Sequence, residues 1–328
     1  MTISGIMNDK KGIGRLAMLA MSAAVLTACQ YKDLEEPVKT PFKVEFNHGR
    51  VDSIPKSYRV AFYPADEETR EYITKGYMLF DVPPTACMLE LPAGKYEVTA
   101  FNNDTEHVIT DGYGNQMELS AKTPKARPHG INGTPIIIDS LYGGQTVTDY
   151  PDYMTHTVSD SFVLNDGDED QTLTLTPDSM VVTVEIRAGG IKGLTHVKEI
   201  RGSVNNVAGT RLIAHDNITR DTTAVIFNCR ANATQNTVRA KLYLFGIEPT
   251  AERGLRHTLI FYFWMEHGTK VYIPVDITAL MNKVSADERY VFIDIPDIGV
   301  DLEKYDTVKN TFHTEVEDWK DEHVELNF

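Results

Sequence analysis

The chain has 328 residues, 24% of them charged, and a formal net charge of -15. Its length allows two domains of ordinary size, each with a core of its own. An acidic surface of this strength repels phosphate backbones, so the composition argues against nucleic acid as a partner.

Residues 1–28 have the pattern of a lipoprotein signal peptide. Basic residues precede an apolar stretch, Leu16–Thr27, which has the length of a signal h-region. A spanning helix needs roughly 20 apolar residues, so this stretch fits a removed leader better than a permanent span. The run LTAC places small residues before Cys29, whose thiol accepts a diacylglyceryl group. We expect lipidation at Cys29 and attachment to a membrane through the acyl chains; an ordinary secretory signal is the alternative.

The polar, proline-containing residues 29–40 predict a tether, and residues 41–165 predict an N-terminal β-sandwich domain. In this domain Phe42, Val44 and Phe46 alternate with charged residues, which is typical of a half-buried strand. One short helix is expected over 66–75, with Asp66 as N-cap and Gly76 after its end. Further strands are expected over 58–62, 77–80, 87–91 and 96–101.

Residues 110–153 are rich in Gly, Pro, Asp and Tyr. A long irregular stretch inside a domain is either functional or loosely packed. Tyr142, Tyr150 and Tyr153 would form a partner-contacting loop with aromatic faces; tyrosines that pack over the edge of a core are the alternative reading.

Residues 166–328 predict a C-terminal β-sandwich domain. The acidic run 165–170 resembles a calcium loop, but Gln171 and Pro177 occupy the positions of the required Gly and Glu, which favours a solvated hinge at the domain boundary. Turns are expected at 189–190, 205–206 and 267–268, a helix over 277–283 after Asp276, and a closing strand pair within 312–326. Strands are expected over 171–176, 180–186, 197–204, 223–228, 238–245, 257–264 and 270–275.

The sequence carries no nucleophile elbow, phosphate loop or zinc-protease motif, and no two of its ten histidines have the i, i+2 or i+4 spacing of metal ligands. We expect no catalytic residues, no metal, no cofactor and no enzymatic activity. Cys87 and Cys229 are expected as free, buried thiols, although an exported compartment would permit a disulfide.

Four features together resemble one bacterial family. They are the lipobox cysteine, the turn and strand LPAGKYEVTAFN, the stretch QTLTLTPDSMVVTVEI and the terminal VEDWKDEHVEL. The chain is similar to the Bacteroidales fimbrial anchor lipoproteins. The resemblance implies an all-β fold of two tandem antiparallel, transthyretin-like Greek-key β-sandwich domains, and a structural role at the base of a pilus-like fibre with fimbrial subunits as partners.

Two further features of the sequence resemble features of exported proteins from these bacteria. An acidic cluster soon after Cys29, as at 33–36, is associated there with display on the outer face of the outer membrane; a solvated linker explains it equally well. The Asp-Ser/Thr-apolar tripeptides resemble O-glycosylation acceptors, with surface turns the better candidates. The candidate acceptors are Ser53, Ser140, Ser179, Thr222 and Thr307.

The expected function is therefore to anchor or assemble a fimbria at the outer membrane. Edge strands of a sandwich offer unpaired N–H and C=O groups to an incoming strand, and such a task needs no catalytic groups. The alternative is a surface lipoprotein that binds glycans or host molecules through the loop tyrosines.

Overall fold

The computed structural model describes residues 37–126, 145–167, 170–247, 255–285 and 287–305. The body of the chain, from Lys39 onward, is a single compact unit. Cys29, Ser140, Tyr142, Thr307 and the expected strand pair within 312–326 lie outside the described residues. No helix among the described residues has the length and apolar character to span a bilayer.

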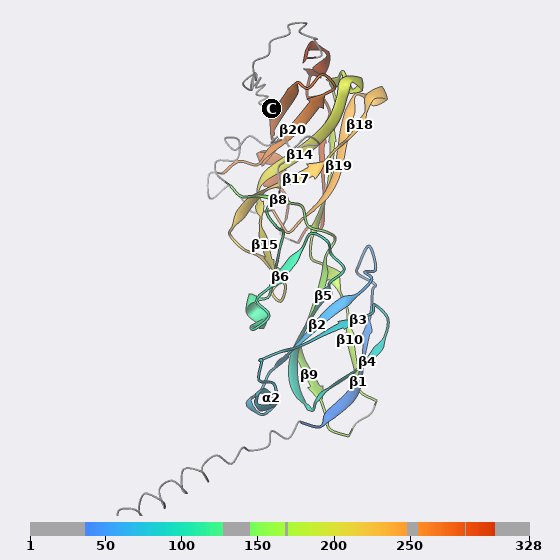
Figure 1. The fold of residues 1–328 in the computed structure, drawn as a ribbon, viewed down its shortest axis with the longest axis vertical. Helices are drawn as coiled ribbons and strands as arrows, with labels where there is room; N and C mark the ends of the chain where they lie inside the picture. The colour runs from blue at the N-terminus through green and yellow to red at the C-terminus, as the bar shows by residue number, and fades with distance from the viewer. Residues whose placement is uncertain (1–36, 127–144, 168–169, 248–254, 286, 306–328) are drawn as a thin grey trace, which may run out of the picture. The chain divides into compact units, whose positions relative to one another are not determined.

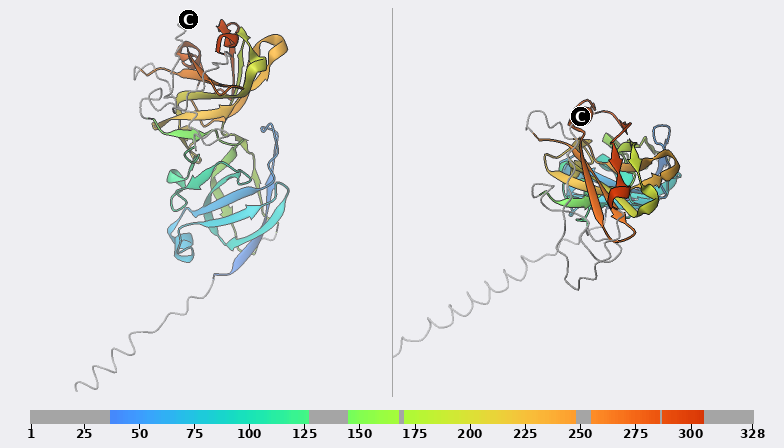
Figure 2. Two further views of the ribbon diagram at one scale, coloured as in Figure 1. Left: turned by 45° about the horizontal axis from the view of Figure 1, so that its top comes forward. Right: turned by 90° about the horizontal axis from the view of Figure 1, so that it is seen from above.

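The first sandwich joins a five-stranded sheet, in the order β11-β9-β5-β2-β3, to a three-stranded sheet, β10-β1-β4. Figure 1 shows these strands as one group and the left view of Figure 2 shows the same group after a turn. The strands are β1 (Lys39–Phe46), β2 (Tyr58–Pro64), β3 (Met78–Val82), β4 (Cys87–Pro92), β5 (Gly94–Asn102), β9 (Thr155–Leu164), β10 (Thr172–Leu175) and β11 (Asp178–Ser179).

Aromatic side chains fill the space between these two sheets. Phe42 on β1 meets Phe62 on β2 edge to face, with ring centroids 5.8 Å apart, and lies 5.1 Å from the ring of Phe162 on β9. Phe42 and Phe62 are fully buried. Such ring pairs contribute about 0.5–1.5 kcal/mol beyond their buried area. The apolar residues that alternate around Phe42 therefore belong to the core of the first sandwich.

The second sandwich joins the sheet β18-β19-β12-β22 to the sheet β21-β20-β14-β17-β8. Its apolar core takes residues from both sheets, among them Ile186, Leu242 and Phe261. The strands are β8 (Val147–Asp149), β12 (Val182–Ala188), β14 (Val197–Ala208), β17 (Thr222–Asn228), β18 (Arg230–Asn232), β19 (Thr237–Leu244), β20 (Thr258–Met265), β21 (Lys270–Asp276) and β22 (Tyr290–Ile295). The all-β sandwich fold expected from the sequence is confirmed.

A small sheet and an apolar cluster connect the two sandwiches. The sheet has the order β16-β15-β7-β6, and its strands are β6 (Ile109–Asp111), β7 (Ser120–Lys122), β15 (Thr210–Leu212) and β16 (Asn217–Ile218). The cluster contains Phe101 of β5, Met154 before β9 and Phe245 after β19. Because residues of both sandwiches share one buried cluster, separating them would expose apolar surface, at a cost of about 25 cal/mol per Å².

The short elements agree with their capping signals. Helix α2 (Glu67–Tyr72) begins after Asp66, whose Oδ1 accepts a 2.8 Å hydrogen bond from the amide of Thr69, as predicted. Helix α3 (Thr278–Met281) is shorter than expected, although Asp276 does accept from the Thr278 amide. The remaining elements are β13 (Ile191–Lys192), β23 (Val300–Asp301) and the 3-10 turns η1 (Gln116–Glu118), η3 (Leu194–His196), η4 (Ala233–Gln235) and η6 (Leu302–Tyr305).

One expected turn is wrong. Asn205 and Asn206 lie inside β14, where the pairing with β17 shifts register between Val204 and Val207. Asn206 has a φ of 56°, a left-handed conformation that asparagine adopts more readily than most residues. The Asn-Asn pair therefore makes a β-bulge, which lets the strand continue instead of reversing.

The acidic run 165–170 connects two strands that both belong to the first sandwich. Strand β9, before it, pairs with β5, and β10, after it, pairs in parallel with β1. Strand β11 then pairs with β9, and the sheets of the second sandwich take up the chain at β12. This strand pairing extends the first sandwich to residue 179. The domain boundary expected at residue 165 stays a prediction.

The described parts of residues 110–153 include short strands that pair with other segments. Strand β7 pairs with β15, and β8 pairs in parallel with β17. Thus this stretch contributes strands to sheets that it shares with the second half of the chain. The expectation of a loose loop is wrong for these residues, because a stretch rich in turn residues still contains short runs that sheets can recruit.

Candidate functional site

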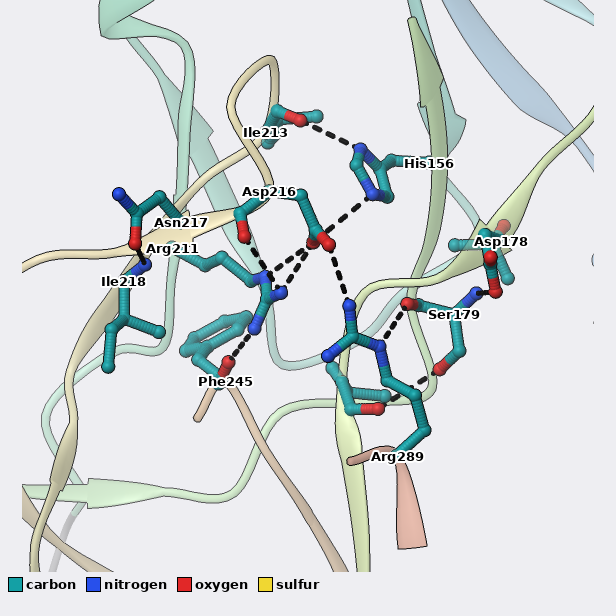
Figure 3. A network of polar contacts seen from close by, with 12 residues as sticks. His156, Asp178, Ser179, Arg211, Ile213, Asp216, Asn217, Ile218, Phe245 and Arg289 are labelled. Atoms are coloured by element: carbon teal, nitrogen blue, oxygen red, sulfur yellow. Dashed lines mark hydrogen bonds and ion pairs between the residues drawn. The ribbon is translucent and has the colours of Figure 1, made fainter. Parts of the chain in front are cut away.

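A charged cluster lies where segments of both sandwiches meet, and Asp216 is at its centre (Figure 3). The Asp216 carboxylate accepts hydrogen bonds from Arg289 Nη2 at 2.6 Å and from Arg211 Nε at 2.9 Å. The Nε2 atom of His156 lies 3.2 Å from Asp216 Oδ1. We call these four residues the Asp216 cluster.

The turn between β15 and β16 positions the carboxylate. Asp216 has a φ of 49°, a left-handed conformation that aspartate tolerates because its short side chain bonds locally. Arg211 lies on β15, and its guanidinium also donates to the main-chain oxygen of Asp216 at 3.1 Å. The tight turn therefore brings Asp216 back over Arg211.

His156 on β9 connects this turn to the first sandwich. Its Nδ1 lies 2.8 Å from the carbonyl oxygen of Ile213, and its Nε2 faces Asp216. The ring is 8% exposed. Both ring nitrogens thus face oxygen atoms, one of the Ile213 main chain and one of the Asp216 carboxylate.

The two arginines extend the cluster to the second sandwich. Arg211 donates to the carbonyl oxygen of Phe245, directly after β19. Arg289, directly before β22, donates from Nε to the carbonyl oxygen of Ser179 at 3.0 Å. The Arg211 side chain is only 4% exposed, and burial lowers its pKa against the opposing effect of Asp216. Arginine stays charged even so, because its ordinary pKa is the highest of any side chain.

The cations determine the charge of Asp216. Burial by itself would raise its pKa, but the hydrogen bond from His156 and the positive charge of Arg211 outweigh burial and lower the pKa to about 2. Asp216 is thus ionised at neutral pH. Removing one partner from a buried ion pair leaves an uncompensated charge, which costs about 3–5 kcal/mol. The Asp216 cluster is suited to holding the sandwiches together, and it presents no nucleophile.

A second polar cluster fastens the β6–β7 segment to the outer face of the first sandwich. Arg59 on β2 binds both carboxylate oxygens of Asp81 on β3, at 2.7 and 2.8 Å. Its Nη1 also donates to the Tyr113 hydroxyl at 3.1 Å, and the Tyr113 ring stacks on Tyr77 with centroids 6.1 Å apart. Tyr113 therefore holds its loop against β2 and β3.

Several sheets end in edge strands that expose apolar side chains. Strand β22 is the last strand of its sheet, and Tyr290 and Phe292 on its outward face are 50% and 52% exposed. Strand β4 ends the three-stranded sheet and exposes Met88 to 58%. Among the described residues, these edges leave backbone groups available for pairing with another strand.

The tyrosines expected to contact a partner are partly buried. Tyr153 packs against the apolar cluster that connects the two sandwiches, and its ring lies 5.6 Å from the Tyr243 ring. Its hydroxyl accepts a hydrogen bond from the Asp52 amide at 3.0 Å. Tyr150 packs against the core of the second sandwich. Both described tyrosines thus have the environment of rings that cover a core edge, and a role in partner contact stays a prediction.

The expected glycosylation acceptors have different environments. Ser53 is exposed in a bend. Ser179 is 8% exposed, and its hydroxyl donates to the Val181 carbonyl oxygen at 3.0 Å. Thr222 is half-buried and accepts from Gln145 at 2.9 Å. Only Ser53 of these three presents an open hydroxyl.

The two described cysteines are free, as predicted. Each cysteine residue as a whole is partly exposed and not fully buried as expected. Burial nevertheless raises the pKa of the Cys87 thiol and of the Cys229 thiol. No group of three or more His, Cys, Asp or Glu side chains within the described ranges has a geometry that would hold a metal ion.

The sequence offered no sign of the Asp216 cluster. His156, Arg211, Asp216 and Arg289 follow no motif, and up to 133 residues separate them along the chain. The one local signal is the polar run at 215–217, which predicts a turn but not its partners.

Comparison with known proteins identifies a family and a curated relative. The family described as Domain of unknown function (DUF5119) matches residues 28–228. A Bacteroides ovatus protein provisionally named fimbrium anchoring subunit Fim4B is 29% identical over 134 residues, which is 38% of this chain and 37% of that protein. The match thus spans little more than a third of this curated relative.

Solved structures share the fold. A crystal structure of a provisionally assigned Bacteroides ovatus adhesin matches with a TM-score of 0.58 and 17% identity, over 90% of this chain and 99% of the other. A second such adhesin from the same species matches with a TM-score of 0.50 and 7% identity, over 78% and 89%. The resemblance to the fimbrial anchor superfamily that the sequence predicted is confirmed.

Proposed function

We propose, from the premise that this chain belongs to the DUF5119 family, that it is an outer-membrane lipoprotein that anchors or assembles a fimbria at the cell surface. The observation that carries the proposal is the similarity to the fimbrium anchoring subunit Fim4B over 134 residues. The role is structural and not enzymatic.

The anchor to the membrane is a lipid on Cys29. The family match begins at residue 28, directly before this cysteine, which is consistent with a shared region that starts at the mature end. A diacylglyceryl group with a further acyl chain gives stable attachment, because each buried methylene contributes about 0.8 kcal/mol. Residues 29–40 then act as the tether, and the acidic cluster at 33–36 supports display toward the cell exterior.

The body between lipid and fibre has to transmit force without coming apart. Two features support this role: the buried apolar cluster shared by the sandwiches and the Asp216 cluster beside it. A joint that combines apolar burial with a charged cluster resists both separation and twisting, because ion pairs with several hydrogen bonds are directional. The fold is therefore suited to a mechanical role.

Partner binding requires a surface that a fimbrial subunit recognises. Strand β22 is the best-placed edge for strand addition, because it lies at the end of its sheet and exposes Tyr290 and Phe292. An added strand would gain main-chain hydrogen bonds from the open edge, and its side chains would contact these aromatic rings. Substituting Phe292 by Lys would weaken such an interaction.

Metabolic labelling tests the lipid anchor. Cells expressing the chain are fed an alkyne palmitate analogue with and without globomycin, and the Cys29→Ser variant is the matched control. We expect label and outer-membrane fractionation for the natural chain only, and accumulation of the unprocessed precursor with globomycin. A processed, unlabelled and freely soluble product would overturn lipidation.

A deletion strain tests the fimbrial role separately. Loss of the chain should release fibres into the medium or change their length, and the natural chain should co-purify with a fimbrial subunit from outer-membrane extract. Complementation with the natural gene should restore attached fibres, whereas the Cys29→Ser variant should not. Unchanged fibres in the deletion strain would rule out anchoring while leaving lipidation intact.

A further inference from the structure

One face of the second sandwich carries a row of arginines in a protein that is otherwise acidic. Cross-strand register places Arg187 of β12 opposite Arg239 of β19, and Arg239 opposite Arg230 of β18. Neighbouring strands lie about 4.8 Å apart, so three positive charges cross the sheet within about 10 Å. The chain as a whole has a net charge of -15.

All three side chains are on the outward face. The core of the sandwich takes the alternate residues, such as Ile186 on β12 and Val238 on β19. Arg230 and Arg239 are exposed, and neither side chain has a hydrogen bond or ion pair within the part of the chain that the structure describes. Like charges directly opposite one another destabilise a sheet, so the row costs stability and no described carboxylate offsets it at these two positions.

The acidic side chains on this face are already paired. Asp294 on β22 lies 3.6 Å from Arg187, at the end of the row. Glu185 on β12 lies 3.5 Å from Lys241 of β19 and accepts a 3.0 Å hydrogen bond from the Tyr290 hydroxyl. The open positive charge is therefore concentrated at Arg230 and Arg239.

Aromatic rings lie in the adjacent rows of the same face. Phe292 on β22 is opposite Glu185, and it is 52% exposed. Tyr290, one row further, is 50% exposed. We call the surface formed by Arg187, Arg230, Arg239, Lys241, Tyr290 and Phe292 the arginine face. An exposed aromatic next to guanidinium groups is a combination that neither folding nor solubility requires.

We propose that the arginine face binds an acidic polysaccharide, that is, a polymer of sugars that carry carboxylates. Guanidinium groups form paired hydrogen bonds with carboxylates, and an aromatic ring packs against the apolar face of a sugar. A flat, open sheet face suits an extended polymer better than a small ligand, which needs a concave pocket. Nucleic acid fits less well, because the acidic body of the protein repels a densely charged phosphate backbone.

This binding goes beyond the anchoring role and does not depend on it. A fimbrial anchor at the cell surface would use the arginine face to hold the acidic polysaccharide that surrounds it. A chain without any fimbrial partner would still bind the polymer, because all six residues belong to this chain.

The test uses the full-length chain in detergent and three polymers: polygalacturonate, a neutral galactan and poly-L-glutamate. Binding is measured by calorimetry at low and at physiological salt. The variant R230Q/R239Q removes two charges from the arginine face. The matched control, K192Q/K198Q, removes two exposed charges on β13 and β14. Melting midpoints no lower than that of the natural chain establish that all variants fold.

We expect the natural chain to bind polygalacturonate, not the neutral galactan, and to bind more weakly at higher salt. R230Q/R239Q should lose about tenfold in affinity, which corresponds to about 1.4 kcal/mol, whereas K192Q/K198Q should stay within about twofold. Phe292→Ala should weaken binding to polygalacturonate and leave binding to poly-L-glutamate unchanged.

Three results would overturn the proposal. Equal losses in R230Q/R239Q and K192Q/K198Q would reduce the effect to net charge. Binding of poly-L-glutamate as tight as that of polygalacturonate, with no effect of Phe292→Ala, would indicate an acidic protein as the partner. Absence of binding to both polygalacturonate and poly-L-glutamate would show that the arginine face is not a binding site for acidic polymers. None of these results bears on fibre release in the deletion strain, so the two proposals fail independently.

Discussion

The imidazole of His156 on β9 lies 3.2 Å from the carboxylate of Asp216, which belongs to the turn after β15. Strand β9 is part of the first sandwich, while Asp216 also binds Arg289, which precedes β22 of the second. One carboxylate thus joins segments from both halves of the body. Mutations in the Asp216 cluster measure the stability of this joint, and they are therefore the most direct test of the proposed mechanical role.

Replacing Asp216 by Asn should lower the free energy of unfolding by about 3 kcal/mol, because the nearly buried guanidinium of Arg211 would lose its anion. Urea unfolding followed by circular dichroism measures the change. Asp160→Asn is the matched control, since Asp160 is exposed on β9 and its side chain forms no hydrogen bond or ion pair with the described residues. Equal stability of the two variants would contradict a role for the Asp216 cluster.

Stability should fall in acid because of the same carboxylate. The pKa of Asp216 is about 2 in the folded protein and 3.8 as its ordinary value, so the unfolded chain binds a proton at higher pH than the folded one. This contribution is therefore complete above about pH 5 and is lost as the pH falls toward 2. With allowance for solvent screening at a side chain that is 34% exposed, it amounts to about 1 kcal/mol.

Unfolding midpoints measured in urea between pH 2 and pH 7 test this dependence. The Asp216→Asn variant should show a flatter profile below pH 5 than the natural chain. Profiles that run parallel throughout would assign the acid sensitivity to other carboxylates.

Tyr113→Phe should destabilise the attachment of the β6–β7 segment by about 1 kcal/mol. The substitution removes a hydroxyl that accepts from Arg59 at 3.1 Å and also contacts the Thr110 hydroxyl, while the ring can still stack on Tyr77. Hydrogen exchange of the amides in 109–122 is the most direct readout. Tyr72→Phe, at a tyrosine that is 47% exposed, should change nothing and serves as the control.

Gly112→Ala should cost more than Gly268→Ala, although both glycines have a positive φ, +83° and +89°. A Cβ at Gly112 would lie 2.2 Å from the carbonyl oxygen of Glu118, whereas a Cβ at Gly268 meets nothing within 4 Å. The φ strain alone costs about 1–2 kcal/mol, and the clash at Gly112 adds to it. Thermal unfolding of the two variants compares them; a larger loss for Gly268→Ala would refute the assigned packing.

Ser53 should carry an O-linked glycan and Ser179 should not. Ser53 is exposed in a bend, whereas the Ser179 side chain is buried and its hydroxyl donates to a carbonyl oxygen. Mass spectrometry of the protein isolated from its own bacterium should show one glycan fewer after Ser53→Ala and no change after Ser179→Ala. Modification of folded protein at Ser179 would require β11 to detach from β9.

Several elements were predictable because their signals are local. The alternation at Phe42, Val44 and Phe46 appears as β1, and the N-cap at Asp66 starts α2. Two of the strands that escaped prediction did so for clear physical reasons. Strand β22 (Tyr290–Ile295) carries exposed aromatics between its buried residues, which conceals the period of two, and β9 (Thr155–Leu164) has few apolar residues.

The sequence by itself determined the strand-rich body, the candidate lipid anchor at Cys29 and most of the strands and turns, since backbone preference and apolar alternation act between close neighbours. Tertiary structure alone decided which strands pair, that β10 lies beside β1, and that His156, Arg211 and Arg289 surround Asp216. It also aligned Arg187, Arg230 and Arg239 in one row. Such contacts arise from cross-strand register between distant segments, and no local pattern encodes that register.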